Sequence, residues 1–103
     1  MNAPTFDADG YPTEDTLDAI RDWPNDQLAE LPAFVIAAWS DYGRADLCEA
    51  TGLLHLSTGG WSGNESIIEA LQANTLFWML FWKLSERGGR YVFDLSRIPK
   101  EKP

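Results

Sequence analysis

The sequence predicts a single small α+β domain, in which an antiparallel sheet packs against helices in the order α-α-β-α-β-β. Three observations predict this class. The first forty residues carry two helical apolar patterns, and Leu53–Ser57 alternates with a period of two before a third helical pattern. Residues 76–95 then have the composition of two strands joined by a glycine turn.

Composition limits the class of protein. At 103 residues with 45% apolar content, the chain 1–103 has the size of one domain and can bury a core. One cysteine, Cys48, excludes an intrachain disulfide and a cysteine-rich metal site. The first ten residues lack the apolar stretch of a signal peptide, and the run Leu76–Trp82 is too short to span a bilayer. We therefore expect a cytoplasmic protein with no membrane contact, no cofactor and no metal.

The net charge of −8 is unevenly distributed along the chain. Residues 1–50 contain eleven acidic residues and only two arginines. Such an acidic half opposes phosphate backbones, so direct nucleic-acid binding is not expected. The same charge suits docking onto a basic protein surface, although acids that merely solvate helical faces give the same composition.

The first half of the chain is predicted to form an N-terminal arm followed by two helices. Residues 1–12 contain two prolines and a glycine and predict a loose N-terminal arm. Thr13 can cap a helix that Pro24 ends, because the residue before proline avoids the α region. Asn25 then caps a second helix, which we expect to break near Leu31 because Pro32 follows.

For two segments, the local pattern is compatible with more than one secondary structure. Within residues 41–52, Tyr42-Gly43 predicts a turn, and Arg44 to Ala50 fit either a helical turn or an irregular edge strand. Residues 76–84 are rich in aromatic residues, which favours a strand over a continuation of the helix that starts near Glu65. The turn 87–90 and the alternating segment 91–95 make that strand half of a hairpin, and its two apolar faces predict a central strand. Residues 98–103 predict a frayed, charged tail.

The loop between the strand and the next helix carries a distinctive string. It reads LHLSTGGWSGNE from Leu54 to Glu65, and it is followed by Phe77-Trp78 and by Arg87-Gly88-Gly89 before Tyr91. In these residues the chain resembles a family of small uncharacterised proteins found mainly in bacteriophages, prophages and bacterial genomes. The resemblance covers residues 53–95. It implies a mobile-element origin and a shared fold, and it carries no activity over.

The glycine-rich loop 57–65 is the first candidate site. Glycines allow close backbone approach, and a helix N-terminus attracts anions, so the loop could bind a small ligand or nucleotide. The spacing matches neither a P-loop nor a dinucleotide fingerprint. Ser62 and Glu65 also fit a structural capping box that would occupy the same helix end. The binding hypothesis involves loop residues and two arginines that would supply positive charge: Thr58, Gly59, Gly60, Trp61, Asn64, Arg87 and Arg90.

No catalytic constellation is predicted, so we expect a protein that is not an enzyme. His55 is the only histidine, and a strand histidine is more often structural than catalytic. Cys48 is a weak nucleophile candidate, because Asp46 and Glu49 should raise the pKa of its thiol.

A protein interface is the remaining candidate. Five tryptophans exceed what a core of this size needs, and Trp61 lies among glycines that can bury little of it. The leading hypothesis is a non-catalytic phage- or prophage-type binding protein that acts on a host or phage protein, as a counter-defence or host-takeover inhibitor in the host cytoplasm. The alternative is a small-ligand or nucleotide-binding domain that uses loop 57–65. The oligomeric state is not predicted.

Overall fold

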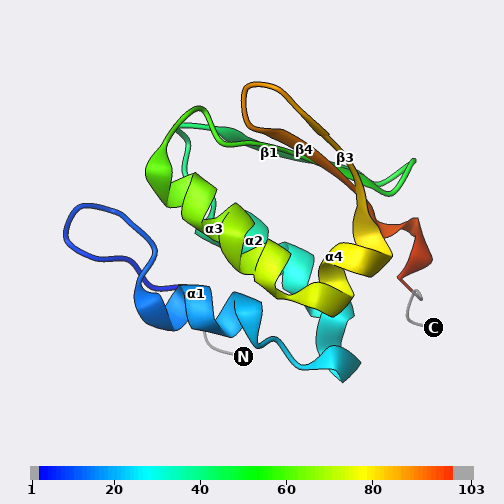
Figure 1. The fold of residues 1–103 in the computed structure, drawn as a ribbon, viewed down its shortest axis with the longest axis horizontal. Coiled ribbons are helices and arrows are strands. Elements are labelled where there is room, and N and C mark those ends of the chain that lie inside the picture. The colour runs from blue at the N-terminus through cyan, green and yellow to red at the C-terminus, as the bar shows by residue number, and fades with distance from the viewer. Residues whose placement is uncertain (1–2, 99–103) are drawn as a thin grey trace.

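Four antiparallel strands form one sheet, and the helices lie on one side of it (Figure 1). The structure is a computed structural model and describes residues 3–98. The helices are α1 (Glu14–Arg21), α2 (Leu31–Ala38), α3 (Ser62–Ala73) and α4 (Thr75–Phe81), with 3-10 helices η1 (Asn25–Glu30) and η2 (Leu95–Arg97). The strands are β1 (Arg44–Cys48), β2 (Leu53–Ser57), β3 (Trp82–Glu86) and β4 (Arg90–Asp94), in the order β1-β2-β4-β3. The predicted α+β class is confirmed.

The predicted strand 53–57 is confirmed as β2, in the middle of the sheet. Leu54 and Leu56 face the helices and are buried, as their period-two spacing predicts. Leu54 lies opposite Phe93 of β4 in the antiparallel register. This pairing places the large apolar side chains of the two central strands on the same, helix-covered face.

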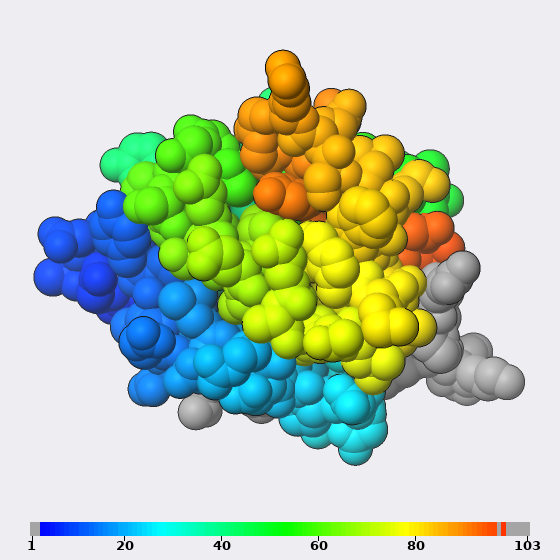
Figure 2. Space-filling model, viewed as in Figure 1, coloured from blue at the N-terminus to red at the C-terminus, as the bar shows by residue number. Residues whose placement is uncertain are grey.

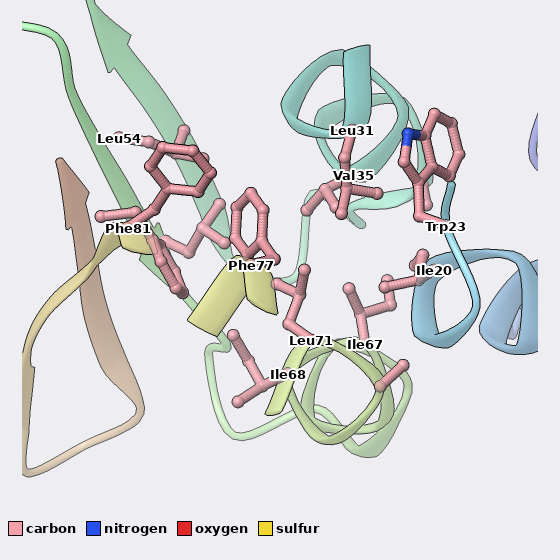
Figure 3. Packing of buried hydrophobic residues seen from close by; sticks show 14 of the residues in the cluster. Ile20, Trp23, Leu31, Val35, Leu54, Ile67, Ile68, Leu71, Phe77 and Phe81 are labelled. Atoms are coloured by element: carbon pink, nitrogen blue, oxygen red, sulfur yellow. The ribbon is translucent and has the colours of Figure 1, made fainter. Parts of the chain in front are cut away.

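The core fills the space between the sheet and the helices (Figure 3). Side chains from four helices and one strand point toward one another there. They are Ile20 of α1, Leu31 and Val35 of α2, Leu54 of β2, Ile67 and Leu71 of α3, and Phe77 and Phe81 of α4. Burying so many branched and aromatic side chains supplies most of the driving force for folding.

Of the helix starts predicted in the first half of the chain, some are confirmed and one is wrong. Thr13 caps α1 as predicted, and its hydroxyl oxygen accepts a hydrogen bond from the Thr16 backbone N–H at 3.3 Å. The break near Leu31 is also confirmed, with Pro32 in the first turn of α2. Asn25 is not a cap, because Pro24 holds that position and the segment that follows is the 3-10 helix η1.

The prediction of a central strand over residues 76–84 was wrong. Residues 75–81 form α4, and only the segment from Trp82 onward is a strand, which lies at the sheet edge. Helix α4 starts after its N-cap Asn74, whose side-chain Oδ1 accepts a hydrogen bond from the Phe77 N–H at 3.1 Å. Phe77 and Phe81, four residues apart, then both enter the core, which overrides the strand preference of aromatic residues. The predicted hairpin turn after Glu86 is present.

The described part of the N-terminal segment is not a loose arm. Residues 5–13 fold back on themselves, with a hydrogen bond of 3.1 Å from Thr13 N to Thr5 O and a bridge between Phe6 and Pro12. Thr5 N also donates to the Thr16 hydroxyl at 2.8 Å, which fastens the loop to α1. Of the two alternatives for residues 41–52, the edge strand is the one formed, as β1.

The predicted tail lies mostly outside the described residues, since it covers 98–103. Ile98 is described, and it packs against the core cluster rather than fraying.

Candidate functional site

Thr58 anchors the glycine-rich loop that joins β2 to α3. Its side chain is buried, and its hydroxyl oxygen accepts a hydrogen bond from Gly60 N at 3.2 Å. Its backbone N–H donates to Gly89 O at 3.0 Å, and its carbonyl accepts from Trp61 N at 3.2 Å. Thr58 therefore ties the loop to the hairpin turn and holds the start of α3.

Asn64 is a structural amide rather than a free ligand-binding group. The side chain is fully buried, and its Oδ1 accepts a hydrogen bond from Ser40 N at 3.0 Å. Its Nδ2 donates to Thr58 O at 3.2 Å and to Ser40 O at 3.4 Å. The amide thus joins the loop to the end of α2, and both its oxygen and its nitrogen are occupied.

The predicted capping box of Ser62 and Glu65 does not form. Trp61 occupies the N-cap position of α3 in an extended conformation, and no side chain caps the helix. The helix therefore begins one residue earlier than the box requires, and Ser62 is its first residue. The Ser62 hydroxyl instead lies 3.4 Å from the Tyr11 hydroxyl.

The two arginines proposed to serve the loop lie at the hairpin end of β4. Arg90 Nε is 3.4 Å from Glu86 Oε1, and Arg90 Nη2 is 3.4 Å from His55 Nδ1. Arg87 is exposed in the turn between β3 and β4. The positive charge of Arg90 is therefore directed to Glu86 and His55. The small-ligand alternative stays a hypothesis, and the Thr58 hydroxyl and the Asn64 amide that it invokes are already hydrogen-bonded within the fold.

Trp61 is half-buried and belongs to an aromatic cluster with Tyr11 and Tyr42. Its ring centroid lies 4.8 Å from that of Tyr11 and 5.2 Å from that of Tyr42. Tyr42 is 72% exposed and Tyr11 is 38% exposed. Offset and tilted ring pairs at these distances are mutually stabilising, so the exposed rings are held in place by one another.

Three segments far apart in the sequence build this aromatic cluster. Figure 2 shows the N-terminal loop, in blue, against the first turn of α3, in green. Tyr42 comes from the turn between α2 and β1. The sequence pattern pointed to Trp61 and missed both tyrosines, because no local pattern signals a contact with a residue that lies 50 positions away, as Tyr11 does, or 19 positions away, as Tyr42 does.

The backbone beneath the aromatic cluster is closely packed. A Cβ on Gly59 would overlap the Tyr42 carbonyl, and a Cβ on Gly63 would overlap the Trp61 ring. In the N-terminal loop, Asp7 Oδ1 accepts hydrogen bonds from Asp9 N at 2.9 Å and from Tyr11 N at 3.0 Å. The cluster therefore rests on a well-defined scaffold.

The open face of the sheet carries the only histidine. Asp46, His55, Val92 and Leu84 lie side by side across the four strands. Val92 is buried, whereas His55 and Leu84 are half-buried. The polar neighbour of the His55 ring is Arg90, which is the environment of a structural surface histidine rather than of a general base.

The pKa prediction for Cys48 was wrong in direction. The thiol is exposed, and hydrogen bonding from the Thr51 side chain is the largest cause that lowers its pKa from the usual value. The backbone N–H of Thr51 adds to the effect. The neighbouring carboxylates of Asp46 and Glu49 do not raise the pKa of this thiol, because water screens charges at the surface.

Three further findings bear on function. Within residues 3–98, no three or more His, Cys, Asp or Glu side chains gather where they could hold a metal ion. None of the helices in this range is long and apolar enough to cross a membrane. Comparison of the chain with family models, with curated proteins and with solved structures gives no match.

Proposed function

We propose that this protein is a non-catalytic binding module that acts on a protein partner through the aromatic cluster of Tyr11, Tyr42 and Trp61. The observation that carries the proposal is the exposure of Tyr42, whose ring stays at the surface beside Trp61 although a core lies close by. Tyrosine and tryptophan are enriched among residues that dominate binding energy. A rigid scaffold lowers the entropy that such rings lose on binding.

The charge around the aromatic cluster supports a basic partner. Asp41 precedes Tyr42, and the N-terminal loop that carries Tyr11 also carries Asp7 and Asp9. Complementary charge speeds association and excludes partners of like charge. An arginine or lysine of the partner would in addition gain a cation–π contact with the exposed rings. Nucleic acid is not the proposed partner, because its phosphates would meet these carboxylates.

The biological setting of the proposal comes from the resemblance of residues 53–95 to phage and prophage proteins. On that basis we propose a host or phage protein as the partner and the host cytoplasm as the location. A counter-defence or host-takeover inhibitor is the concrete form of such a binding module. Small size, acidic charge and the surface aromatic cluster suit an inhibitor that covers a basic site on its target.

A cross-linking experiment tests the proposal. A photoreactive phenylalanine analogue at position 42 should capture one dominant protein from a bacterial lysate, whereas the same analogue at the exposed Met79 should not. With the purified partner, Tyr42→Ala and Trp61→Ala should each weaken binding by about 2 kcal/mol, or roughly thirtyfold. Met79→Ala is the matched control, because that side chain is 74% exposed and lies in α4, away from the cluster.

The result can contradict the proposal in two ways. Equal capture at positions 42 and 79 would mean that the cluster has no specific partner. Unchanged binding by a folded Tyr42→Ala variant would mean that the partner docks elsewhere. Circular dichroism of each variant shows that it is folded before binding is measured.

A further inference from the structure

Strand β1 is an edge of the sheet with an unbroken register. All five of its residues, Arg44–Cys48, pair with β2, and within the described chain no strand lies on its other side. Alternate residues of an edge strand turn their backbone N–H and C=O groups outward, where they can pair with another extended chain.

The opposite edge is protected in a way that β1 is not. The register of β3 against β4 shifts between Trp82 and Leu84, so Lys83 lies at an irregularity in that strand. Bulges and edge lysines are two devices that prevent an edge strand from pairing with other chains. Strand β1 carries the charged side chains of Arg44 and Asp46 but has no bulge and no lysine, so its unbroken backbone ladder makes it the edge more able to accept an added strand.

A groove runs along β1, between this strand and α2. Two clefts meet at Ile36, one of about 720 Å³ beside Leu47 and one of about 300 Å³ beside Ala45. Pro32 and Leu47 give the larger cleft an apolar lining, and Leu47 is 42% exposed although it faces the helix side of the sheet. The groove can therefore hold apolar side chains that project from a strand added to β1.

The groove is bordered by negative charge. Glu30 and Glu49 line the larger cleft, and Asp41 and Asp46 line the smaller one. Among the residues that the structure describes, Arg44 is the one basic residue that lines either cleft, and its Nε lies 3.3 Å from Asp46 Oδ2. An occupant with positive charge is therefore favoured over an acidic one.

We propose that β1 and this groove form a second binding site, which takes an extended peptide segment of a partner protein by strand addition. The segment pairs its backbone with β1 and places alternate apolar side chains in the groove. The lysine or arginine residues between them lie on the open face of the sheet, where Asp46 of β1 also lies. A second copy of this chain is a poorer occupant, because pairing two β1 strands would bring acidic rims together. The inference does not rest on the aromatic cluster, whose residues lie outside the groove lining.

Synthetic octapeptides provide the test. In one array, valine, leucine, isoleucine or phenylalanine alternates with lysine or arginine, and in a matched array glutamate or aspartate replaces the basic residues. The full chain should bind the best basic peptides roughly tenfold more tightly than their acidic counterparts, as expected from a few surface ion pairs. The best basic peptide is then resynthesised with N-methyl groups on alternate amides, in both possible phases. One phase should lose binding and the other should keep it, because only one set of amides faces β1.

Variants locate the site. Leu47→Lys should abolish binding of the best basic peptide, because it places a positive charge in the groove. Trp61→Ala and Met79→Lys should bind that peptide like the unmodified chain, which separates this site from the proposed aromatic interface. On binding, amide hydrogen exchange should slow in Arg44–Cys48 and stay unchanged in Trp82–Glu86.

Each of several outcomes would overturn the proposal. They are no binding in the basic array at millimolar peptide, equal binding of acidic peptides, equal loss in both N-methyl phases, or protection of β3 instead of β1. A dimer in sedimentation that Leu47→Lys dissociates would show that a second copy, and not a peptide, occupies the edge.

Discussion

Two buried asparagines satisfy backbone groups that helices and strands leave without partners. Asn74 accepts from Phe77 N and donates to Ile20 O at 3.0 Å, so it starts α4 and fastens it to the end of α1. Asn64 does the same between Ser40 and Thr58. In the described residues no buried side-chain nitrogen or oxygen lacks a partner. A neutral amide suits both places, because it donates and accepts without the cost of burying a charge.

Replacing Asn64 with alanine should lower the free energy of unfolding by about 2–4 kcal/mol, because Ser40 N–H and Thr58 C=O would lose a buried partner. Urea unfolding followed by tryptophan fluorescence measures the loss. Asn25→Ala is the control, since Asn25 is exposed, and its effect should stay within about 0.5 kcal/mol. An Asn64→Ala variant as stable as this control would show that Asn64 is not a structural residue and would reopen a ligand-binding role.

At the scale of elements, the loop between β2 and α3 depends on close backbone contact with a neighbouring turn. Gly59 and Gly60 both have positive φ, at +66° and +75°, in the region that disfavours residues with a Cβ. They differ in surroundings, because a Cβ on Gly59 would overlap the Tyr42 carbonyl whereas a Cβ on Gly60 meets nothing within 4 Å. The pair separates the effect of backbone conformation from the effect of packing.

We expect Gly60→Ala to cost about 1–2 kcal/mol through its positive φ alone. Gly59→Ala should cost roughly 1–3 kcal/mol more, because the turn that carries Tyr42 must move. Urea unfolding gives both values. The Gly59 variant should also weaken binding of a partner captured through Tyr42, and the Gly60 variant should not. Equal stability of the two variants would contradict the close packing of the loop on the turn.

The sequence pattern predicted correctly those elements whose residues are specified by contacts with near neighbours in the chain. Burial alternates along strand 53–57, and the helix that follows buries Ile67 and Leu71 at helical spacing. Helix α4 was missed because its start depends on Asn74, whose amide reaches Ile20, 54 positions away in the chain. The capping box was predicted from the right residue types, but the chain enters the helix one residue earlier, with Trp61 at the cap.

In the candidate site, too, some residues could be predicted from the sequence and others could not. Trp61 was recognisable from its position in a glycine-rich loop, because a large ring there has few local partners. Tyr11 and Tyr42 were not, since each lies in a turn whose own sequence says nothing about the other two segments. An edge strand was one of the two alternatives for the segment that forms β1, but its groove was equally hidden, because a groove between α2 and an edge strand exists only after both have packed.

At the scale of the whole molecule, the negative charges of the folded chain are not matched by positive ones. The described residues contain four salt bridges, and all of their side chains are largely exposed. Exposed pairs contribute little to stability because water screens them. The net charge of −8 therefore acts mainly as repulsion, which raises the free energy of the folded chain but favours association with a basic partner.

This excess of repulsion predicts that salt stabilises the isolated protein. Raising NaCl from about 20 to about 500 mM should increase the free energy of unfolding in urea by about 1 kcal/mol, because screening weakens repulsion more than it weakens exposed ion pairs. The double variant Asp9→Lys and Glu69→Lys changes two exposed acids and moves the net charge from −8 to −4, since each reversal adds two charges. Its gain with salt should be clearly smaller, and it should bind the basic partner more weakly at low salt. If salt destabilises the unmodified chain instead, attraction within the four ion pairs outweighs repulsion, and the acidic surface costs the fold nothing.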